Sequence, residues 1–149
     1  MYSDFIIRAY HPSDLDSVIN LLKLNTPQYF APIEEKDFIH YLNHEIELYF
    51  LVEYDNAIVA CGGCNFSQDK TVGIISWDIV HPDFQGKGIG SRLLKYRIDL
   101  LKMEYYMVSI IVRTSQFTYK FYEKLGFERK EIVENYWAQD FHLYRMEYK

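Results

Sequence analysis

A strand, a glycine turn and a helix follow one another in the middle of the sequence and constrain the fold more than any other feature. The segment Thr71–Val80 (TVGIISWDIV) is rich in β-branched residues, which indicates a strand, and Pro82 ends it. The turn QGKGIG follows, and apolar residues then recur at helical spacing over Ile89–Met103, with Tyr96 among them. A helix that leaves the end of a strand packs back on a sheet, so we expect both kinds of element in one core.

The same periodicity predicts the elements on either side. Two apolar runs flank Asp55-Asn56, a dipeptide typical of tight hairpin turns, and a second antiparallel pair closes the C-terminus. Expected strands cover residues 4–9, 47–54, 57–66, 71–80, 107–113, 128–136 and 141–148; expected helices are one capped by Ser13 or Asp14 and three at 34–44, 89–103 and 116–125. This order of seven strands and four helices predicts an α/β fold with a mixed, mostly antiparallel sheet covered by helices.

Length and composition point to one domain with a small-molecule or peptide partner. The chain has 149 residues without repeat, linker or change of composition, so residues 1–149 are expected to form a single core. A net charge of −5 and the lack of a basic stripe argue against nucleic acid and favour cationic partners. No window approaches about 18 apolar residues and no leader is visible, so we expect no membrane partner and a cytoplasmic location.

Two cysteines, Cys61 and Cys64, form a C-G-G-C motif that could indicate a zinc or redox site. A structural zinc site needs four ligands, and no second Cys or Cys/His pair in the sequence completes this one. The surrounding letters, IVACGGCNF, indicate a strand, on which residues three apart face opposite sides unless a bulge intervenes. We therefore expect two ordinary thiols and no metal.

The glycine turn could bind an anion. Backbone N–H groups converge at a helix N-terminus, and the helix dipole adds about half a positive charge there. A plain tight turn with positive φ explains the glycines equally well. Two nucleotide motifs fail: a P-loop needs Ser or Thr directly after Lys87, and a dinucleotide fingerprint needs a glycine where Ser91 or Leu93 stands. A site for ATP or NAD is therefore not expected.

Two motifs together resemble the GNAT acetyltransferase superfamily. The turn fits Gln-x-x-Gly-x-Gly, and the segment Thr114–Glu128 (TSQFTYKFYEKLGFE) carries the Tyr-Glu-Lys-x-Gly-Phe pattern of the family's second cofactor segment. The resemblance covers nearly the whole chain and is strongest from Ile74 to Phe127. It implies the GNAT-like fold, with acetyl-CoA as the co-substrate.

Carried over to this sequence, the resemblance places the pyrophosphate of acetyl-CoA on the backbone N–H groups of the turn. The main chain of the preceding strand would pair with the pantetheine arm like an added strand. The residues that it assigns to the cofactor are Ile79, Val80, Gln85, Gly86, Lys87, Gly88, Ile89, Gly90, Ser91, Ser115 and Tyr122. Ser115 stands where the family usually has Asn, but Ser also donates and accepts hydrogen bonds.

The resemblance also makes Tyr122 the general acid that protonates the departing CoA thiolate. A phenol with a pKa of about 10 and a thiol with a pKa of about 8.5 are close enough for proton transfer within a hydrogen bond. The chain has 14 tyrosines, most of which are expected to pack in the core. The position in the motif is what distinguishes Tyr122 from the others.

The attacking amine must lose a proton, and the family does not fix the base. Asp78 lies two residues before Val80, on the same face of the strand, and is the carboxylate nearest the expected acetyl group. His81, at the end of that strand, is the other candidate. Aromatic residues of the first long loop and of the C-terminal pair are candidates for the acceptor pocket, although core packing explains each singly: Tyr29, Phe30, Tyr136 and Trp137.

The expected activity is direct transfer of an acetyl group from acetyl-CoA to a primary amine of a small molecule or peptide, in a ternary complex and without an acetyl-cysteine. Backbone N–H groups near Ile79 and Val80 would stabilise the oxyanion. The alternative is a non-catalytic acyl-CoA-binding sensor or regulatory module, which Ser115 and the unassigned base leave open. The sequence does not identify the acceptor, and the C-terminal strand pair could join two copies into a homodimer.

Overall fold

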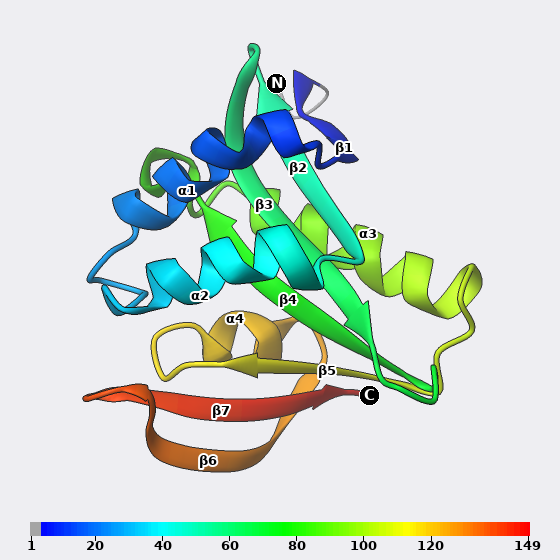
Figure 1. The fold of residues 1–149 in the computed structure, drawn as a ribbon. Helices are drawn as coiled ribbons and strands as arrows, with labels where there is room; N and C mark the ends of the chain where they lie inside the picture. The colour runs from blue at the N-terminus through cyan, green and yellow to red at the C-terminus, as the bar shows by residue number, and fades with distance from the viewer. Residues whose placement is uncertain (1–3) are drawn as a thin grey trace.

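A seven-stranded sheet forms the centre of the structure, a computed structural model that describes residues 4–149 (Figure 1). Residues 1–3, part of the N-terminal stretch in which no leader was expected, lie outside the described residues. The strands lie in the order β1-β2-β3-β4-β5-β7-β6, and only β4 and β5 are parallel neighbours. Their bounds are β1 Ile6–Ala9, β2 Leu48–Tyr54, β3 Ala57–Phe66, β4 Val72–Val80, β5 Ser109–Thr114, β6 Phe127–Ala138 and β7 Phe141–Tyr148. The expected mixed, mostly antiparallel sheet is confirmed.

Four α-helices cover the two faces of this sheet (Figure 1). Their bounds are α1 Leu15–Leu24, α2 Glu34–His40, α3 Ile89–Met103 and α4 Tyr119–Lys124. On one face, α1 and α2 bury Val18 and Phe38 against a cluster that includes Cys61. On the other face, α3 and α4 bury Leu94 and Tyr122 against a second cluster. Burial of apolar side chains on both faces holds the helices to the sheet.

The strands β4 and β5 separate after a short parallel stretch. Their pairing runs from Val72 with Ser109 to Ile75 with Val112, and β4 continues to Val80 without β5 beside it. Figure 1 shows the two strands diverging toward the left of the view. The unpaired edge of β4 can therefore offer main-chain N–H and C=O groups to a ligand in the opening.

A bulge in β4 decides the direction of Asp78. Two residues of β4, Trp77 and Asp78, face the single residue Gly62 of β3. Trp77 adopts a φ of 49°, and the Tyr49 hydroxyl donates a 2.8 Å hydrogen bond to its carbonyl oxygen. Because side chains alternate along a regular strand, the extra residue places Asp78 on the face covered by α3, where it meets Arg97.

The ends of several elements differ from expectation. The expected helix at residues 34–44 is α2 followed by a π turn at Tyr41–Glu45, and the expected helix at 116–125 is only the six-residue α4. Asp14 does precede α1, but its carboxylate accepts a 2.8 Å hydrogen bond from His11 N instead of capping that helix. His11 caps the preceding 3-10 turn, Pro12–Asp14, so Ser13 is not the cap.

The buried face of α3 is also shifted from the expected one. Tyr96 is 42% exposed, whereas the adjacent Arg97 is 1% exposed. The expectation that Tyr96 points inward is wrong, because Arg97 has a carboxylate partner inside the protein and takes that place. Within residues 4–149, no helix is both long and apolar enough to span a bilayer.

Candidate active site

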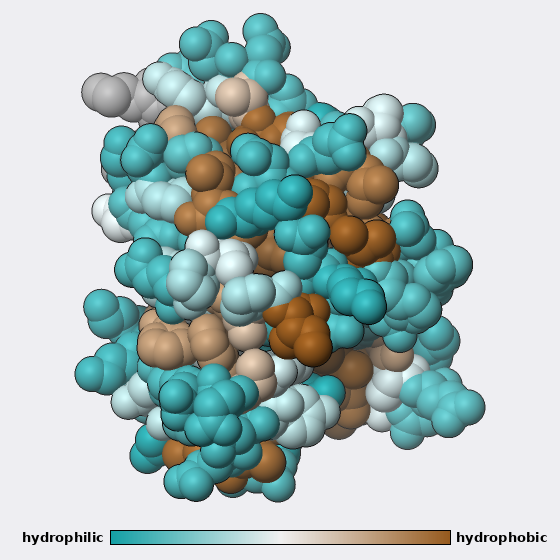
Figure 2. Space-filling view, turned by 60° about the vertical axis from the view of Figure 1, so that its left-hand side comes forward, coloured by the Kyte–Doolittle hydropathy of each residue, from teal (hydrophilic) through white to brown (hydrophobic). Residues whose placement is uncertain are grey.

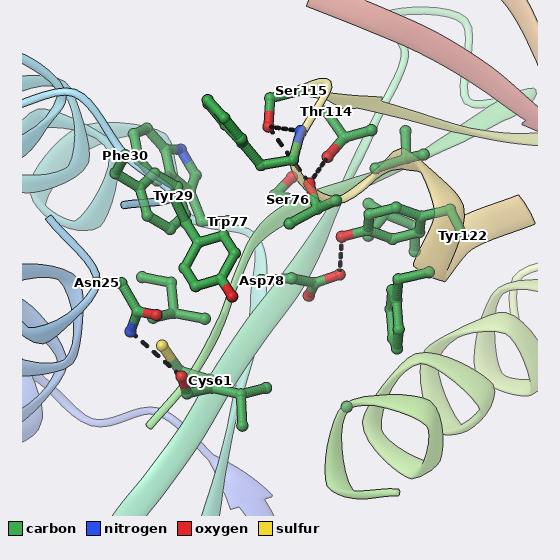
Figure 3. Close-up of a pocket in the computed structure, with 18 of the residues that line it drawn as sticks. Asn25, Tyr29, Phe30, Cys61, Ser76, Trp77, Asp78, Thr114, Ser115 and Tyr122 are labelled. Carbon is green, nitrogen blue, oxygen red and sulfur yellow. Dashed lines mark hydrogen bonds between the residues drawn. The ribbon is translucent and has the colours of Figure 1, made fainter. Parts of the chain in front are cut away.

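A cavity of about 580 Å³ occupies the opening between β4 and β5 (Figure 3). Its walls come from the α1–α2 loop, β4, the glycine turn, the loop before α4 and the adjoining ends of β6 and β7. Figure 2 turns the left-hand side of Figure 1 forward and shows hydrophobic side chains in a broken band across an otherwise hydrophilic face. The volume lies in the range of roughly 300–1,000 Å³ that is typical of small-molecule sites.

The glycine turn forms an open cradle at the start of α3. Gly86 and Gly88 have φ values of 76° and 82°, and a Cβ at either position would meet no atom within 4 Å. Gly88 is the N-cap of α3 and has no side chain to accept the N–H groups of the first helical turn. Free N–H groups and the helix dipole suit a phosphate, so the turn fits the pyrophosphate of acetyl-CoA.

Gln85 joins this turn to the end of β4 and to the end of α1. Its Nε2 donates 3.1 Å hydrogen bonds to Val80 O and to Asn25 Oδ1, and Asn25 Nδ2 donates to the same Val80 carbonyl at 3.2 Å. Asn25 is 3% exposed, and its own carbonyl accepts a 2.9 Å hydrogen bond from Tyr29 N. The hydrogen bonds among Gln85, Asn25 and Val80 therefore connect the glycine turn, the edge of β4 and the α1–α2 loop.

The two expected catalytic residues lie together in the cavity wall. The Tyr122 hydroxyl donates a 2.5 Å hydrogen bond to Asp78 Oδ2, as Figure 3 shows. Tyr122 is 4% exposed, and its ring packs edge-on against Phe121 and Phe127. Burial first, and then the charge and hydrogen bond of Asp78, raise the pKa of Tyr122 well above its usual range. The phenol therefore keeps its proton at neutral pH.

Arg97 of α3 holds the same carboxylate from the other side. Its Nη1 lies 2.5 Å from Asp78 Oδ1 and donates a 2.9 Å hydrogen bond to Gly63 O, while Nε donates to Leu93 O at 3.1 Å. Burial alone would lower the pKa of Arg97, but the charge of Asp78 and the hydrogen bond to it raise the pKa overall. A Cβ at Gly62 would overlap Asp78 Oδ1, so a glycine is needed there. Arg97 thus fixes and neutralises the carboxylate that Tyr122 binds.

Aromatic side chains form the opposite wall. Phe30 stacks on Trp77 with ring centroids 6.1 Å apart and planes 15° apart. Figure 3 shows Tyr29, Phe30 and Trp77 gathered on one side and Tyr122 on the other, with Asp78 between them. Trp137 closes the wall near the β6–β7 turn, where its Nε1 donates a 3.1 Å hydrogen bond to the carbonyl oxygen of residue 114.

Most residues expected in the site line this cavity. They are Tyr29, Phe30, Asp78, Ile79, Val80, Gln85, Gly86, Gly88, Gly90, Ser91, Ser115, Tyr122 and Trp137. The side chains of three others point elsewhere: Ile89 is buried in the core, Lys87 lies over the Phe84 ring, and Tyr136 lies over Arg113. Only the backbone of Lys87 and Ile89 can take part in an anion site. The His81 ring accepts a 3.1 Å hydrogen bond from Asp83 N and caps the turn after β4.

Sequence reasoning missed several polar residues of the site, among them Asn25, Glu34 and Arg97. A signal for Arg97 was present, since it lies four residues from both Leu93 and Leu101 on the apolar stripe of α3. Glu34 is one of three acidic residues in the first turn of α2, and the letters do not show which one turns inward. For Asn25, just after α1, the sequence offers no distinguishing signal.

The two cysteines are buried free thiols, Cys61 in the cluster beneath α1 and α2 and Cys64 in the cluster beneath α3 and α4. Burial raises the pKa of Cys61 to about 12 and that of Cys64 to about 11. Both thiols therefore stay protonated near neutral pH, where a protonated thiol is a poor nucleophile. Across residues 4–149, no three His, Cys, Asp or Glu side chains are grouped so that they could hold a metal ion.

Comparison with known proteins identifies the family. Residues 15–127 match the acetyltransferase (GNAT) family. An N-alpha-acetyltransferase of Saccharolobus solfataricus is 26% identical over 96% of this chain and 92% of that protein. An amino-acid acetyltransferase of Buchnera aphidicola is 24% identical over 79% of this chain, which spans only 26% of that longer protein. The crystal structure of Ard1 from Thermoplasma volcanium superimposes with a TM-score of 0.81 at 20% identity, covering 97% of this chain and 96% of that chain.

The chain belongs to the GNAT acetyltransferase family and is an acetyltransferase. Members of this family use acetyl-CoA and transfer its acetyl group to amines. The family resemblance, the fold class and the enzyme class expected from the sequence are confirmed.

Proposed function

We propose that this chain transfers the acetyl group of acetyl-CoA directly to a primary amine, in a complex that holds both substrates at once. The 2.5 Å hydrogen bond between Tyr122 and Asp78 carries the proposal, because it joins a proton donor to a proton acceptor in the wall of the cavity. The buried, protonated thiols argue against a covalent acetyl-cysteine on Cys61 or Cys64.

Main-chain groups would bind the donor, acetyl-CoA. The N–H groups of Lys87, Gly88, Gly90 and Ser91 would bind the pyrophosphate at the start of α3, and the unpaired edge of β4 would receive the pantetheine arm. Acetyl-CoA supplies the acetyl thioester. N–H groups of the Ile79–Val80 segment would stabilise the oxyanion that forms on the attacked carbonyl.

Asp78 and Tyr122 would act as a linked base and acid. As the amine nitrogen forms its bond to the carbonyl carbon, it loses a proton, which Asp78 accepts directly or through a water molecule. As the carbon–sulfur bond breaks, Tyr122 gives its proton to sulfur, and Asp78 returns a proton to the Tyr122 oxygen along their hydrogen bond. One proton leaves nitrogen and one arrives on sulfur. Arg97 keeps the carboxylate aligned throughout.

The experiment is a steady-state study with acetyl-CoA and a panel of primary amines that includes peptides with free N-termini, the acceptor class suggested by the archaeal relative's name. Release of the CoA thiol and mass spectrometry of the amine would be followed together. Double-reciprocal plots with intersecting lines are expected for a ternary complex. Parallel lines would contradict direct transfer, and tight CoA binding without any acetylated amine would overturn the proposed activity.

A further inference from the structure

Glu34 is a buried carboxylate that has no cationic side chain beside it among residues 4–149. The residue begins α2, is 6% exposed and lines the cavity. Its Oε2 accepts a 2.7 Å hydrogen bond from Ala31 N. In the described part of the chain, no other donor and no Lys, Arg or His side chain meets this carboxylate. An unpaired buried charge is unfavourable, so its presence in a cavity wall calls for a reason.

The contact with Ala31 explains the position of the Glu34 side chain but not why that side chain carries a charge. Glu34 N donates a 2.9 Å hydrogen bond to Ala31 O, and the side chain returns to Ala31 N, as in a capping box. Gln serves in that arrangement as well as Glu does. Burial raises the pKa of Glu34, and the negative charge of Asp37 on the same helix raises it further, against the lowering effect of the Ala31 hydrogen bond. The surroundings within the protein therefore oppose the charge.

The other carboxylate oxygen, Oε1, is free to meet a ligand. It has no hydrogen-bond partner among residues 4–149, and it is not among the fully enclosed polar atoms that lack a hydrogen bond. Since Glu34 lines the cavity, Oε1 is accessible from there.

Aromatic rings that line the same cavity as Glu34 suit a cation. Phe30, Tyr41 and Trp77 line the same cavity, with the Trp77 ring centroid 6.1 Å from that of Phe30 and 6.2 Å from that of Tyr41. The faces of aromatic rings attract organic cations, and this attraction is strongest where water is excluded. A carboxylate and aromatic rings that line one cavity are therefore matched to an ammonium group.

Glu34 also lies apart from the proton-transfer pair. It belongs to α2, which packs on one face of the sheet, whereas Tyr122 packs in the cluster beneath α3 and α4 on the other. The cavity includes residues of both faces because β4 and β5 separate beyond Ile75. Glu34 can therefore hold the acceptor while Asp78 and Tyr122 act on the reacting groups.

We propose that Glu34 binds an ammonium group of the acceptor, so that the acceptor is an organic amine recognised as a cation. This inference rests on the proposed function and specifies the substrate class of the same site. The net charge of −5 on the chain favours the approach of such a molecule.

Binding to the protein–CoA complex tests the inference without turnover. The probe is 1,5-diaminopentane, with 1,5-pentanediol as its uncharged analogue, and the readouts are calorimetry and the fluorescence of Trp77 and Trp137 in the cavity wall. Glu34→Gln keeps an acceptor for Ala31 N and removes the charge. Asp37→Asn is the matched control, because it removes one exposed negative charge from the same helix.

The expected result is that Glu34→Gln weakens diamine binding about 10- to 100-fold and leaves the diol and CoA unaffected, whereas Asp37→Asn has a far smaller effect. A wild-type protein that binds the diamine no better than the diol, or a Glu34→Gln variant that binds both ligands as wild type does, would overturn the inference. Acetyl transfer is measured separately on the same samples. If the diamine binds in a charge-dependent way but no amine is acetylated, only the proposed function is contradicted. If acetyl transfer is the same in wild type and Glu34→Gln, only this inference is contradicted.

Discussion

Gln85 and Asn25, sixty positions apart in the sequence, are joined by a 3.1 Å hydrogen bond between Gln85 Nε2 and Asn25 Oδ1. Gln85 belongs to the turn that fits the pyrophosphate, and Asn25 holds the start of the α1–α2 loop through the hydrogen bond from Tyr29 N. Both side chains also donate to Val80 O. The donor turn and the acceptor wall therefore share one polar anchor at the end of β4.

Replacing Gln85 by Leu should weaken the binding of both acetyl-CoA and the amine. The change removes two hydrogen bonds of about 0.5–1.5 kcal/mol each, so the KM for acetyl-CoA should rise about 10-fold. The KM for the amine should rise as well, because the shared anchor also holds the acceptor loop. Steady-state kinetics measure both values. Gln68→Leu, at an exposed position in the turn between β3 and β4 and away from the cavity, is the control and should change neither. An effect on acetyl-CoA alone would show that the anchor does not connect the two sites.

Tyr122→Phe should lower kcat about 10²- to 10⁴-fold, the usual contribution of a positioned acid or base. The KM for acetyl-CoA should stay close to the wild-type value, since the ring and its packing against Phe121 and Phe127 remain. Rates of thiol release at saturating acetyl-CoA give the comparison. Tyr119→Phe, in the same helix, provides the control. Normal turnover by Tyr122→Phe would show that Tyr122 is not the general acid.

Gly62→Ala should reduce stability and turnover together. The new methyl group would overlap the Asp78 carboxylate and the Arg97 guanidinium, so the unfolding free energy should fall by about 1–3 kcal/mol. Urea unfolding and kcat are the measurements. Gly73→Ala serves as the comparison, because the atoms nearest to its Cβ would be those at the end of the Leu101 side chain, away from the ion pair. It should cost stability without a matching loss of kcat. An unchanged kcat in a folded Gly62→Ala protein would show that the ion pair between Asp78 and Arg97 is not needed for catalysis.

The raised pKa of Glu34 predicts a pH-dependent stability. Because the pKa is higher in the folded than in the unfolded chain, folding favours the protonated acid, and stability is lost as pH rises through the folded pKa. Wild type should thus lose Tm relative to Glu34→Gln as the pH rises above about 4, the usual pKa of a glutamate. Thermal unfolding without ligand measures the difference, with Asp37→Asn as control. A difference that stays constant as the pH rises would show that Glu34 carries no unfavourable charge.

The donor side of the site could be predicted from the sequence because its signals are local. Positive φ at Gly86 and Gly88 follows from a tight turn between a strand and a helix. The position of Tyr122 follows from the second motif. These features depend on neighbours in the chain, so a short run of letters is sufficient to reveal them.

The acceptor side depends on contacts between distant segments and was not visible in the same way. The bulge that places Trp77 and Asp78 together opposite Gly62 arises from pairing with another strand, and the letters SWDIV do not mark it. Burial of Arg97 in place of Tyr96 likewise depends on a carboxylate that another strand supplies. Glu34 differs from its acidic neighbours Glu35 and Asp37 in lining the cavity, a difference that depends on the tertiary fold.

The helix α3 begins at the glycine turn and, nine residues after Gly88, carries the Arg97 that holds Asp78. In the proposed function, this one helix would contribute both to donor binding, at its N-terminus, and to the alignment of Asp78, whereas the α1–α2 loop and the ends of β6 and β7 form the far wall of the cavity. Substitutions within residues 26–33 or 138–141 can accumulate without disturbing that element. The architecture thus lets the choice of acceptor diverge quickly in evolution while the acetylating machinery stays the same.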